Sequence, residues 1–156
     1  VLIEPQVKHT EILKVVGIDG VNKMSKSLNN HIELASTPEE TTKRVREMVT
    51  DPARLRKTDP GNPDICNVFT MHKIFSPQEE VDMINTECRK AGIGCVDCKL
   101  RFANNLNKHL EPFRAKRNEL ASQESYVKDV LNDGGKRARV IAQETMSEVR
   151  EAMQLP

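Results

Sequence analysis

The pattern of apolar and polar positions changes near residue 37. Before it, apolar residues are scattered except in a short run at 12–16. Gly17 and Gly20 close this run, which predicts a strand or extended segment leading into a turn. A loop rich in Ser, Asn and Lys follows at 21–36. From residue 37 onward, apolar residues recur three and four positions apart, which indicates helices with one buried face. The pattern therefore predicts a mainly α fold, a helical bundle preceded by a short strand and loop.

Capping and breaking residues delimit the predicted helices. Residues 37–40 (Thr-Pro-Glu-Glu) form a capping box with Pro at the first helical position, and they start a helix that runs to about Val49. Residues 76–79 (Ser-Pro-Gln-Glu) repeat this pattern. Pro112 is expected to kink a long helix, and the glycine pair at 134–135 is expected to separate the last two helices. The further helices are predicted at about 64–75, 77–91, 97–121, 122–133 and 136–153.

The composition is that of a folded protein and favours no one kind of partner. The 156 residues include 24 Lys and Arg against 23 Asp and Glu, so the net charge is +1, and 37% of them are apolar. No apolar stretch approaches the roughly 20 residues that span a bilayer, and residues 1–6 lack the pattern of a secretion signal. We therefore expect a cytoplasmic location and no membrane partner. Because the chain does not begin with Met, we also expect it to be a piece of a longer polypeptide.

A basic, hydroxyl-rich segment is the first candidate site. It consists of Lys23, Met24, Ser25, Lys26 and Ser27. Two lysines three positions apart can neutralise a polyphosphate while hydroxyl and backbone N–H groups bind its oxygens. Each lysine–phosphate pair is worth about 4 kcal/mol at a separation of roughly 4 Å and an effective dielectric constant near 20, before desolvation. The alternative is an ordinary solvated loop, which is common for Lys-x-Ser-Lys patterns but much less so for the whole pentapeptide.

The four cysteines, Cys66, Cys88, Cys95 and Cys98, form the second candidate site. In a reducing compartment, cysteines clustered in this way favour a metal over disulfides. A Cys-x-x-Cys pair with two further cysteines is enough for a four-thiolate site, which binds either Zn²⁺ or a 4Fe–4S cluster. Each cysteine taken alone would more often be a buried core residue than a ligand. His72 lies on an apolar helix face, which favours a hydrogen-bonded core histidine over a ligand.

Basic residues are concentrated between 99 and 117, where six of them accompany a single acid, Glu111. A basic stripe is the pattern expected for contacts with RNA phosphates. The alternative for each residue is a solvated helix face. The candidate RNA-binding residues are Arg89, Lys99, Arg101 and Lys116.

Residues 23–27 match, without departure, the KMSKS signature of class I aminoacyl-tRNA synthetases. Three further segments, at 16–20 (Val-Gly-Ile-Asp-Gly), 57–63 (Lys-Thr-Asp-Pro-Gly-Asn-Pro) and 88–99, resemble the bacterial tryptophanyl-tRNA synthetase family. This resemblance extends over essentially the whole chain. Tyrosyl enzymes share the pentapeptide, but their C-terminal region is built differently.

The resemblance implies a ligase that joins tryptophan to ATP, with Mg²⁺, releases pyrophosphate and then transfers the tryptophanyl group to tRNA(Trp). Lys23 and Lys26 would be its catalytic residues, which supply positive charge as negative charge moves to the leaving pyrophosphate. Ser25 and Ser27 would offer donors to ATP, and Met24 would seat the loop. The resemblance also favours a 4Fe–4S cluster over zinc at the four cysteines.

The same resemblance implies two domains. Residues 1–36 would be the C-terminal edge of the catalytic domain, and residues 37–156 would form the helical anticodon-binding domain. The family's HIGH-like signature and tryptophan pocket lie upstream of the KMSKS loop, so we expect this chain alone to be inactive and the full-length enzyme to be a homodimer. The competing hypothesis is a free-standing helical, metal-binding RNA module without catalytic activity, which would have no use for the KMSKS loop.

Overall fold

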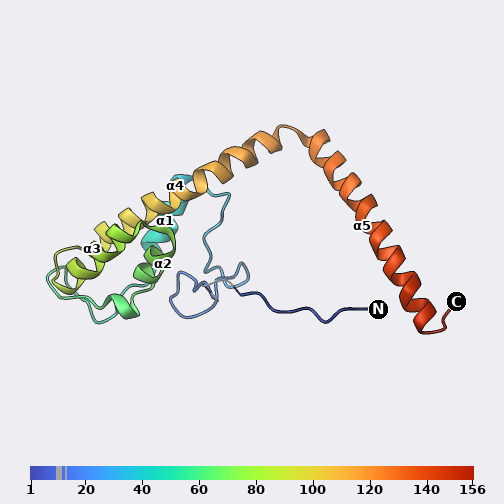
Figure 1. Ribbon diagram of the computed structural model, residues 1–156. Coiled ribbons are helices and arrows are strands. Elements are labelled where there is room, and N and C mark those ends of the chain that lie inside the picture. Colours follow the sequence, from blue (N-terminus) through green and yellow to red (C-terminus); the bar gives the residue numbers. More distant parts are fainter. Residues whose placement is uncertain (10–11, 13) are drawn as a thin grey trace. The chain divides into compact units, whose positions relative to one another are not determined.

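The computed structural model describes residues 1–9, 12 and 14–156, and in this part the chain is mainly helical (Figure 1). The elements are α1 (Pro38–Glu47), the 3₁₀ turn η1 (Pro63–Ile65), α2 (Asn67–Phe75), α3 (Gln78–Arg89), α4 (Cys95–Ala121) and α5 (Glu124–Ala152). The predicted mainly α fold is confirmed. The expected strand at 12–16 is reduced to an isolated antiparallel bridge between Val16 and Lys23, and the described residues contain no strand. Leu13 lies outside the described residues.

The chain divides into two compact units, each of which is described by itself. The first, the loop–helix unit, comprises residues 12–115 and holds the loop after Gly20, α1, α2, α3 and most of α4. The second, the terminal unit, comprises residues 1–11 and 116–156 and holds α5. The proposed domain boundary between residues 36 and 37 stays a prediction.

The capping box at the start of α1 is confirmed. The Glu40 N–H donates to Thr37 Oγ1 at 3.2 Å, and the Thr37 N–H donates to Glu40 Oε2 at 2.8 Å. Two of the N–H groups that every helix leaves without an intrahelical partner are thereby satisfied. The helix ends near the predicted position, and Thr41 and Val45 are its buried residues.

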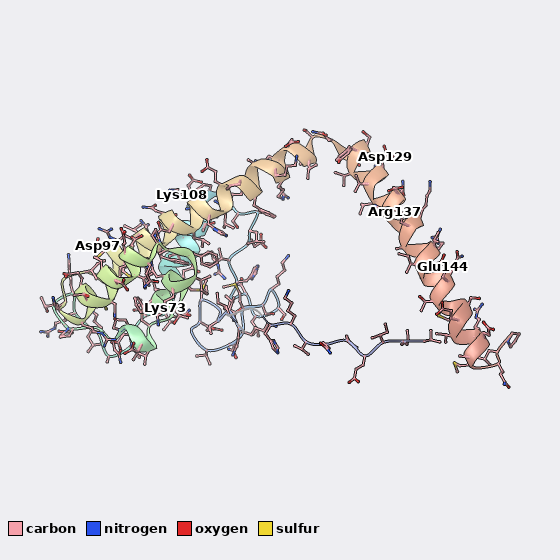
Figure 2. All side chains as sticks on the ribbon, in the orientation of Figure 1. Lys73, Asp97, Lys108, Asp129, Arg137 and Glu144 are labelled. Atoms are coloured by element: carbon pink, nitrogen blue, oxygen red, sulfur yellow. The ribbon has the colours of Figure 1, made fainter. Side chains whose placement is uncertain are left out.

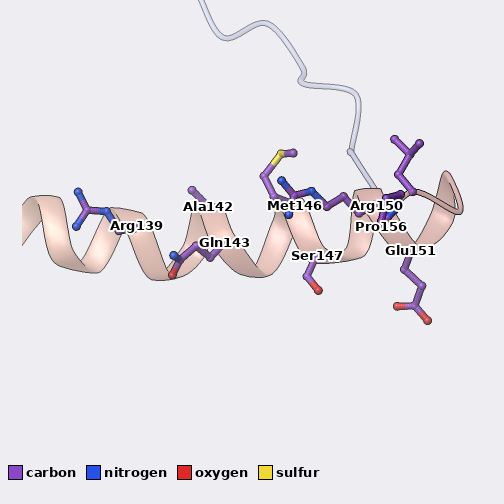
Figure 3. A pocket seen from close by; sticks show the side chains of 9 residues that line it. Arg139, Ala142, Gln143, Met146, Ser147, Arg150, Glu151 and Pro156 are labelled. Carbon is purple, nitrogen blue, oxygen red and sulfur yellow. The ribbon is translucent and has the colours of Figure 1, made fainter.

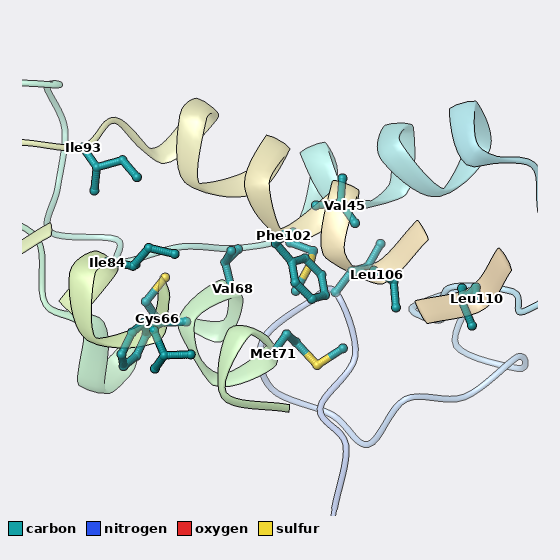
Figure 4. Close-up of a cluster of buried hydrophobic side chains, with 14 residues drawn as sticks. Val45, Cys66, Val68, Met71, Ile84, Ile93, Phe102, Leu106 and Leu110 are labelled. Carbon is teal, nitrogen blue, oxygen red and sulfur yellow. The ribbon is translucent and has the colours of Figure 1, made fainter. Parts of the chain in front are cut away.

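The core of the loop–helix unit is mainly aliphatic and includes the buried rings of Phe69 and Phe102 (Figure 4). Phe102 of α4, Ile84 of α3 and Val45 of α1 are each at most 1% exposed. Val68 of α2 completes the contact between the helices and is 0% exposed. Full burial of one such side chain stabilises the fold by roughly 1.5–3 kcal/mol, so this cluster holds α1, α2, α3 and α4 in one unit.

Several predicted helix starts differ from the structure. The helix predicted at about 64–75 is divided into the turn η1 and α2, which begins at Asn67. Ser76 does not cap α3, because no side-chain cap is present and Pro77 occupies the N-cap position. The Ser76 hydroxyl lies 2.7 Å from His72 Nδ1 instead, which removes it from the helix end. α4 begins at Cys95, two residues before the predicted start, and it continues through Pro112.

The predicted break at residues 134–135 is wrong, because α5 is one helix from Glu124 to Ala152. A glycine in a helix interior costs about 1 kcal/mol relative to alanine and does not forbid the helix. Ion pairs one turn apart offset part of that cost. The Arg137 Nε lies 3.0 Å from Asp133 Oδ2 across the glycine pair, and Lys128 Nζ lies 2.7 Å from Glu124 Oε1. α5 has no buried residue, and charged side chains project along its length (Figure 2).

Candidate functional site

A tight turn positions the KMSKS segment. The Gly17 N–H donates to Asn22 O at 2.8 Å, and the Met24 N–H donates to Val15 O at 2.9 Å. Gly20 at the tip has φ +73°, a left-handed conformation that favours glycine. The local sequence Gly-Ile-Asp-Gly thus reverses the chain, so that the KMSKS segment begins beside Val15 and Val16.

Asp19 closes this turn with its side chain. Its Oδ1 accepts hydrogen bonds from the Val21 N–H at 3.0 Å and from the Asn22 N–H at 3.1 Å. The strongest influence on its pKa is the hydrogen bond from the Asn30 side chain, followed by the bond from the Val21 N–H. Together with the bonds from Asn22 they lower the pKa of Asp19 to about 2. The carboxylate is therefore ionised at neutral pH and is satisfied by donors of its own turn.

The buried amide of Asn30 joins both ends of the KMSKS loop. Asn30 is 3% exposed, its Oδ1 accepts from the Ser25 N–H at 2.7 Å, and its Nδ2 donates to Asp19 Oδ2 at 2.8 Å. The same Nδ2 lies 3.3 Å from the carbonyl oxygen of Lys23. A Cβ at Gly17 would lie 2.2 Å from this nitrogen, so only glycine fits there. Sequence reasoning missed Asn30 because an Asn beside a loop carries no periodic signal.

Lys23 and Lys26 are exposed, and no ion pair engages either ammonium group within the described part of the chain. Ser25 Oγ lies 2.8 Å from Ser27 Oγ, so the hydroxyls of the segment are on the same side of the loop. Met24 is half-buried against the apolar core. The loop therefore presents two positive charges and two hydroxyls on a backbone that hydrogen bonds hold in place, which suits a polyanionic ligand.

The four cysteines meet in one neighbourhood of the loop–helix unit. Cys66 is buried at the start of α2, Cys88 lies near the end of α3, and Cys95 and Cys98 lie in the first turn of α4. All four thiols are free. Arg54, which sequence reasoning missed, links two of them, since its Nη1 lies 3.8 Å from both Cys88 Sγ and Cys95 Sγ.

Close backbone contacts complete the region around Arg54. Its Nη2 donates to the carbonyl oxygens of Lys57 at 2.9 Å and Ile93 at 2.8 Å. The Gly61 N–H donates to Cys88 O at 2.9 Å, and a Cβ at Gly61 would lie 2.6 Å from Cys88 Sγ. The glycine of the 57–63 segment is therefore required for this segment to approach the sulfur.

The electrostatics show that the four sulfurs influence one another. Burial first, and then the charges of the other three cysteines, raise the pKa of the Cys98 thiol to about 12. Burial also raises the pKa of the Cys88 thiol, while the Arg54 guanidinium acts in the opposite direction. Because thiolates are the metal-binding form, such a group needs a cation to offset its charge.

The donor chemistry of these cysteines fits a thiolate-bound metal: four reduced sulfurs within electrostatic reach of one another, with a guanidinium beside two of them. Their spacing is looser than a coordination sphere. Among the residues that the structure describes, no three His, Cys, Asp or Glu side chains are grouped to hold one metal ion. The predicted 4Fe–4S or zinc site thus stays a prediction.

His72 is a core histidine, as predicted. It is 0% exposed, with Nδ1 2.7 Å from Ser76 Oγ and Nε2 3.1 Å from the carbonyl oxygen of Cys98. Its ring packs edge-on against Phe102, with a centroid separation of 5.4 Å. Burial lowers the pKa of His72, so the ring is neutral at pH 7 and serves the packing of α2 against α4.

Each candidate RNA-binding residue already has a partner within the chain. Arg89 lies 2.8 Å from Asp64, Arg101 lies 3.6 Å from Glu80, and Lys116 lies 2.8 Å from Glu119. Lys99 Nζ donates to Arg46 O at 2.8 Å. Surface ion pairs of this kind contribute only about 0–1 kcal/mol, so they leave these cations free to exchange partners.

Arg89, Lys99 and Arg101 adjoin the cysteines in the loop–helix unit, whereas Lys116 belongs to the terminal unit. A pocket in the terminal unit lies beside the last turns of α5 (Figure 3). Its lining residues include Arg139, Gln143, Met146 and Arg150. None of the residues selected from the sequence lines it.

Residues 2–111 match the family described as tRNA synthetases class I (W and Y). The tryptophan–tRNA ligase of Aquifex aeolicus is 45% identical over 154 residues, which are 98% of this chain and 39% of that protein. That of Deinococcus radiodurans is 43% identical over 149 residues, 95% of this chain and 45% of that protein. The crystal structure of tryptophanyl-tRNA synthetase from Campylobacter jejuni, complexed with ADP and tryptophan, has a TM-score of 0.79 at 33% identity and covers 94% of this chain and 45% of that one.

This chain therefore belongs to the class I tRNA synthetases of the W and Y family. Within it, the curated relatives that it resembles are tryptophan–tRNA ligases. The chain spans less than half the length of those relatives. None of its described helices has the length and apolar character needed to cross a bilayer.

Proposed function

We propose that this chain is the part of a tryptophan–tRNA ligase that binds the phosphates of ATP through residues 23–27 and the anticodon of tRNA(Trp) through its helices. The observation that carries the proposal is the loop itself. Lys23 and Lys26 are exposed, and no described acid neutralises them. Asn30 holds the backbone between them by the 2.7 Å bond from the Ser25 N–H.

In the activation step, a carboxylate oxygen of tryptophan attacks the α-phosphorus of ATP. A bond forms between that oxygen and phosphorus, the bond to the bridging oxygen breaks, and pyrophosphate with its Mg²⁺ leaves. Lys23 and Lys26 are the catalytic residues of this chain, because their ammonium groups stabilise the charge that develops on the leaving pyrophosphate. Ser25 and Ser27 donate to phosphate oxygens, and Met24 seats the loop against the core.

In the transfer step, the helices bind tRNA(Trp) while its 3′ end receives the tryptophanyl group. Arg89, Lys99, Arg101 and Lys116 contact the phosphates or bases of the anticodon arm. Arginine suits splayed bases because its planar guanidinium both stacks and donates. The described chain has few aromatic rings to serve instead. The full-length ligase is a cytoplasmic homodimer in this proposal.

The proposal includes a 4Fe–4S cluster on Cys66, Cys88, Cys95 and Cys98, with Zn²⁺ as the alternative. Support comes from the four reduced thiols, whose charges influence one another, and from the Arg54 cation beside Cys88 and Cys95. The cluster would tie α2, α3 and α4 together by linking residues far apart in sequence. Arg54 would offset part of the thiolate charge and hold the backbone of Lys57 and Ile93 around the sulfurs.

The test uses tryptophan-dependent ATP–pyrophosphate exchange by the full-length ligase of which this chain is proposed to be a part. Lys26→Ala should lower the exchange rate by about 100-fold or more while tryptophan binding changes little. Lys43→Ala, which removes an exposed lysine of α1, is the matched control and should leave the rate unchanged. Exchange by the 156-residue chain alone, or a normal rate for Lys26→Ala, would contradict the proposal.

A further inference from the structure

The segment after the KMSKS residues is bound to α1 by one arginine. Arg44 Nε lies 3.3 Å from the carbonyl oxygen of His31, and its Nη2 lies 3.2 Å from the same oxygen. Nη2 also donates to the carbonyl oxygen of Asn29. Nη1 is held by Glu47 of the same helix at 2.6 Å, which fixes the guanidinium plane. One side chain therefore grips the backbone on both sides of Asn30.

The backbone carbonyls to which Arg44 donates flank Asn30 and therefore set the direction of its side chain. Asn29 has φ 49°, a left-handed conformation that a non-glycine residue adopts at a cost. Its N–H donates to Lys26 O at 3.0 Å, which closes the turn that ends the KMSKS residues. The arginine contacts with the carbonyls of Asn29 and His31 stabilise this turn, and Asn30 is thereby pointed inward at the Ser25 N–H and the Lys23 carbonyl.

α1 is in turn fastened to α4. Arg114 Nη2 donates to Thr41 Oγ1 at 2.6 Å, and its Nη1 donates to Asn107 Oδ1 at 2.8 Å. At the other end of α1, Lys99 Nζ donates to the carbonyl oxygen of Arg46 at 2.8 Å. Consecutive hydrogen bonds thus run from α4 through α1 and Arg44 to the backbone of the loop.

We propose that Asn30 and Arg44 are positioning residues that hold the KMSKS loop ready for the triphosphate of ATP, and that Arg44 makes the position of this loop depend on α1. This inference rests on the proposed function, because it assigns residues to the same phosphate site. Neither side chain needs to touch the nucleotide. Asn30 is buried, and all three guanidinium nitrogens of Arg44 have partners within the chain. Their effect is on the geometry in which Lys23 and Lys26 meet the phosphates.

The experiment uses the full-length ligase and four variants: Arg44→Met, Arg44→Lys, Asn30→Ala and the control Lys43→Met. Lys43 is exposed on the same helix, so its loss removes one positive charge without touching the loop. Arg44→Met and Asn30→Ala should each lower kcat/KM for ATP in pyrophosphate exchange by about 10-fold to 100-fold. KM for tryptophan should stay within about twofold of the wild-type value. Arg44→Lys should recover only part of the loss, because an ammonium group cannot grip two carbonyls as a guanidinium does.

A second readout separates positioning from general loss of structure. Hydrogen–deuterium exchange of the peptide that covers residues 23–30 should become at least about tenfold faster in Asn30→Ala and Arg44→Met, while peptides from α2 and α3 keep their wild-type rates. An equal fall in kcat/KM for ATP and for tryptophan, together with faster hydrogen–deuterium exchange throughout the loop–helix unit, would show a merely structural role. That result would overturn the inference. Wild-type kinetics in both variants would also overturn it. A wild-type ligase without tryptophan-dependent exchange would instead refute the proposed function.

Discussion

The two candidate sites of this chain are built in different ways. The KMSKS loop is organised mainly by contacts between residues that are near in sequence: the bonds of Asn30 to Asp19, Lys23 and Ser25 span at most 11 positions, and those of Arg44 to the loop backbone span 13 to 15. The cysteine neighbourhood is assembled from distant segments, since Arg54 reaches Cys88 across 34 positions and Cys95 across 41. Changes in the loop should therefore alter catalysis with little effect on stability. Changes around the cysteines should alter the fold itself.

The largest effect is expected at the cysteines. Protein prepared without oxygen should be brown and contain about four irons per chain, as a 4Fe–4S cluster requires, and Cys88→Ser should lose this iron and unfold at lower temperature. Elemental analysis of both proteins, with melting curves, measures this outcome. Finding one zinc and no iron per chain would reject the iron–sulfur cluster but would support a metal site at these cysteines. Free thiols, together with a melting temperature that a chelator does not change, would show that the cysteines are ordinary core residues.

Truncation of the core ring comes next. Phe102→Ala should lower the free energy of unfolding by about 3–5 kcal/mol, because Phe102 is 0% exposed and packs against His72. Phe113→Ala on the same helix is the matched control, since this ring is 48% exposed. Urea unfolding of both variants compares them, and equal losses would contradict the assignment of the core.

The basic residues should give a moderate effect on RNA binding. Replacing Arg101 and Lys116 together with alanine should weaken tRNA(Trp) binding by the full-length ligase and flatten its dependence on salt, because fewer counterions are released. Lys128→Ala with Arg137→Ala removes the same charge from α5 and should change neither quantity. An unchanged salt slope for the first pair would show that the stripe is only a solvated face.

The turn of the loop should respond to acid in a narrow range. The folded pKa of Asp19, about 2, lies below its ordinary value of 3.8, so its contribution is complete above pH 3.8 and is lost as the pH falls through 2. NMR of the Val21 and Asn22 amides should show their hydrogen bonds weakening over this range. Asn30→Ala removes the largest cause of the lowered pKa and should move the loss to higher pH. An identical titration in both proteins would contradict the role of Asn30.

The smallest effect is expected in α5. Gly134→Ala should stabilise the helix by up to about 1 kcal/mol, because no atom lies within 4 Å of the added Cβ. Gly61→Ala is the contrasting change, since its Cβ would lie 2.6 Å from Cys88 Sγ and must displace the sulfur. Melting temperatures of the two variants should therefore shift in opposite directions.

Much of the helical arrangement was predictable from local patterns. The Thr37 capping box involves residues within one turn of each other, and it appears in the structure as predicted. The errors also have local causes. Ser76 has the pattern of a cap, but its hydroxyl bonds to His72. Gly134 and Gly135 have the pattern of a helix end, but the ion pair between Asp133 and Arg137 spans them.

What the sequence determined by itself was the set of chemical groups: two lysines and two hydroxyls in one pentapeptide, four cysteines, and helices with one apolar face. Only the tertiary structure decided which other side chains hold these groups. Asn30 and Arg44 act through backbone atoms of the loop, and Arg54 reaches sulfurs on two other segments. The physical reason is that helix periodicity and capping depend on neighbours a few residues away, whereas a buried amide or guanidinium finds its partners only after the chain has packed.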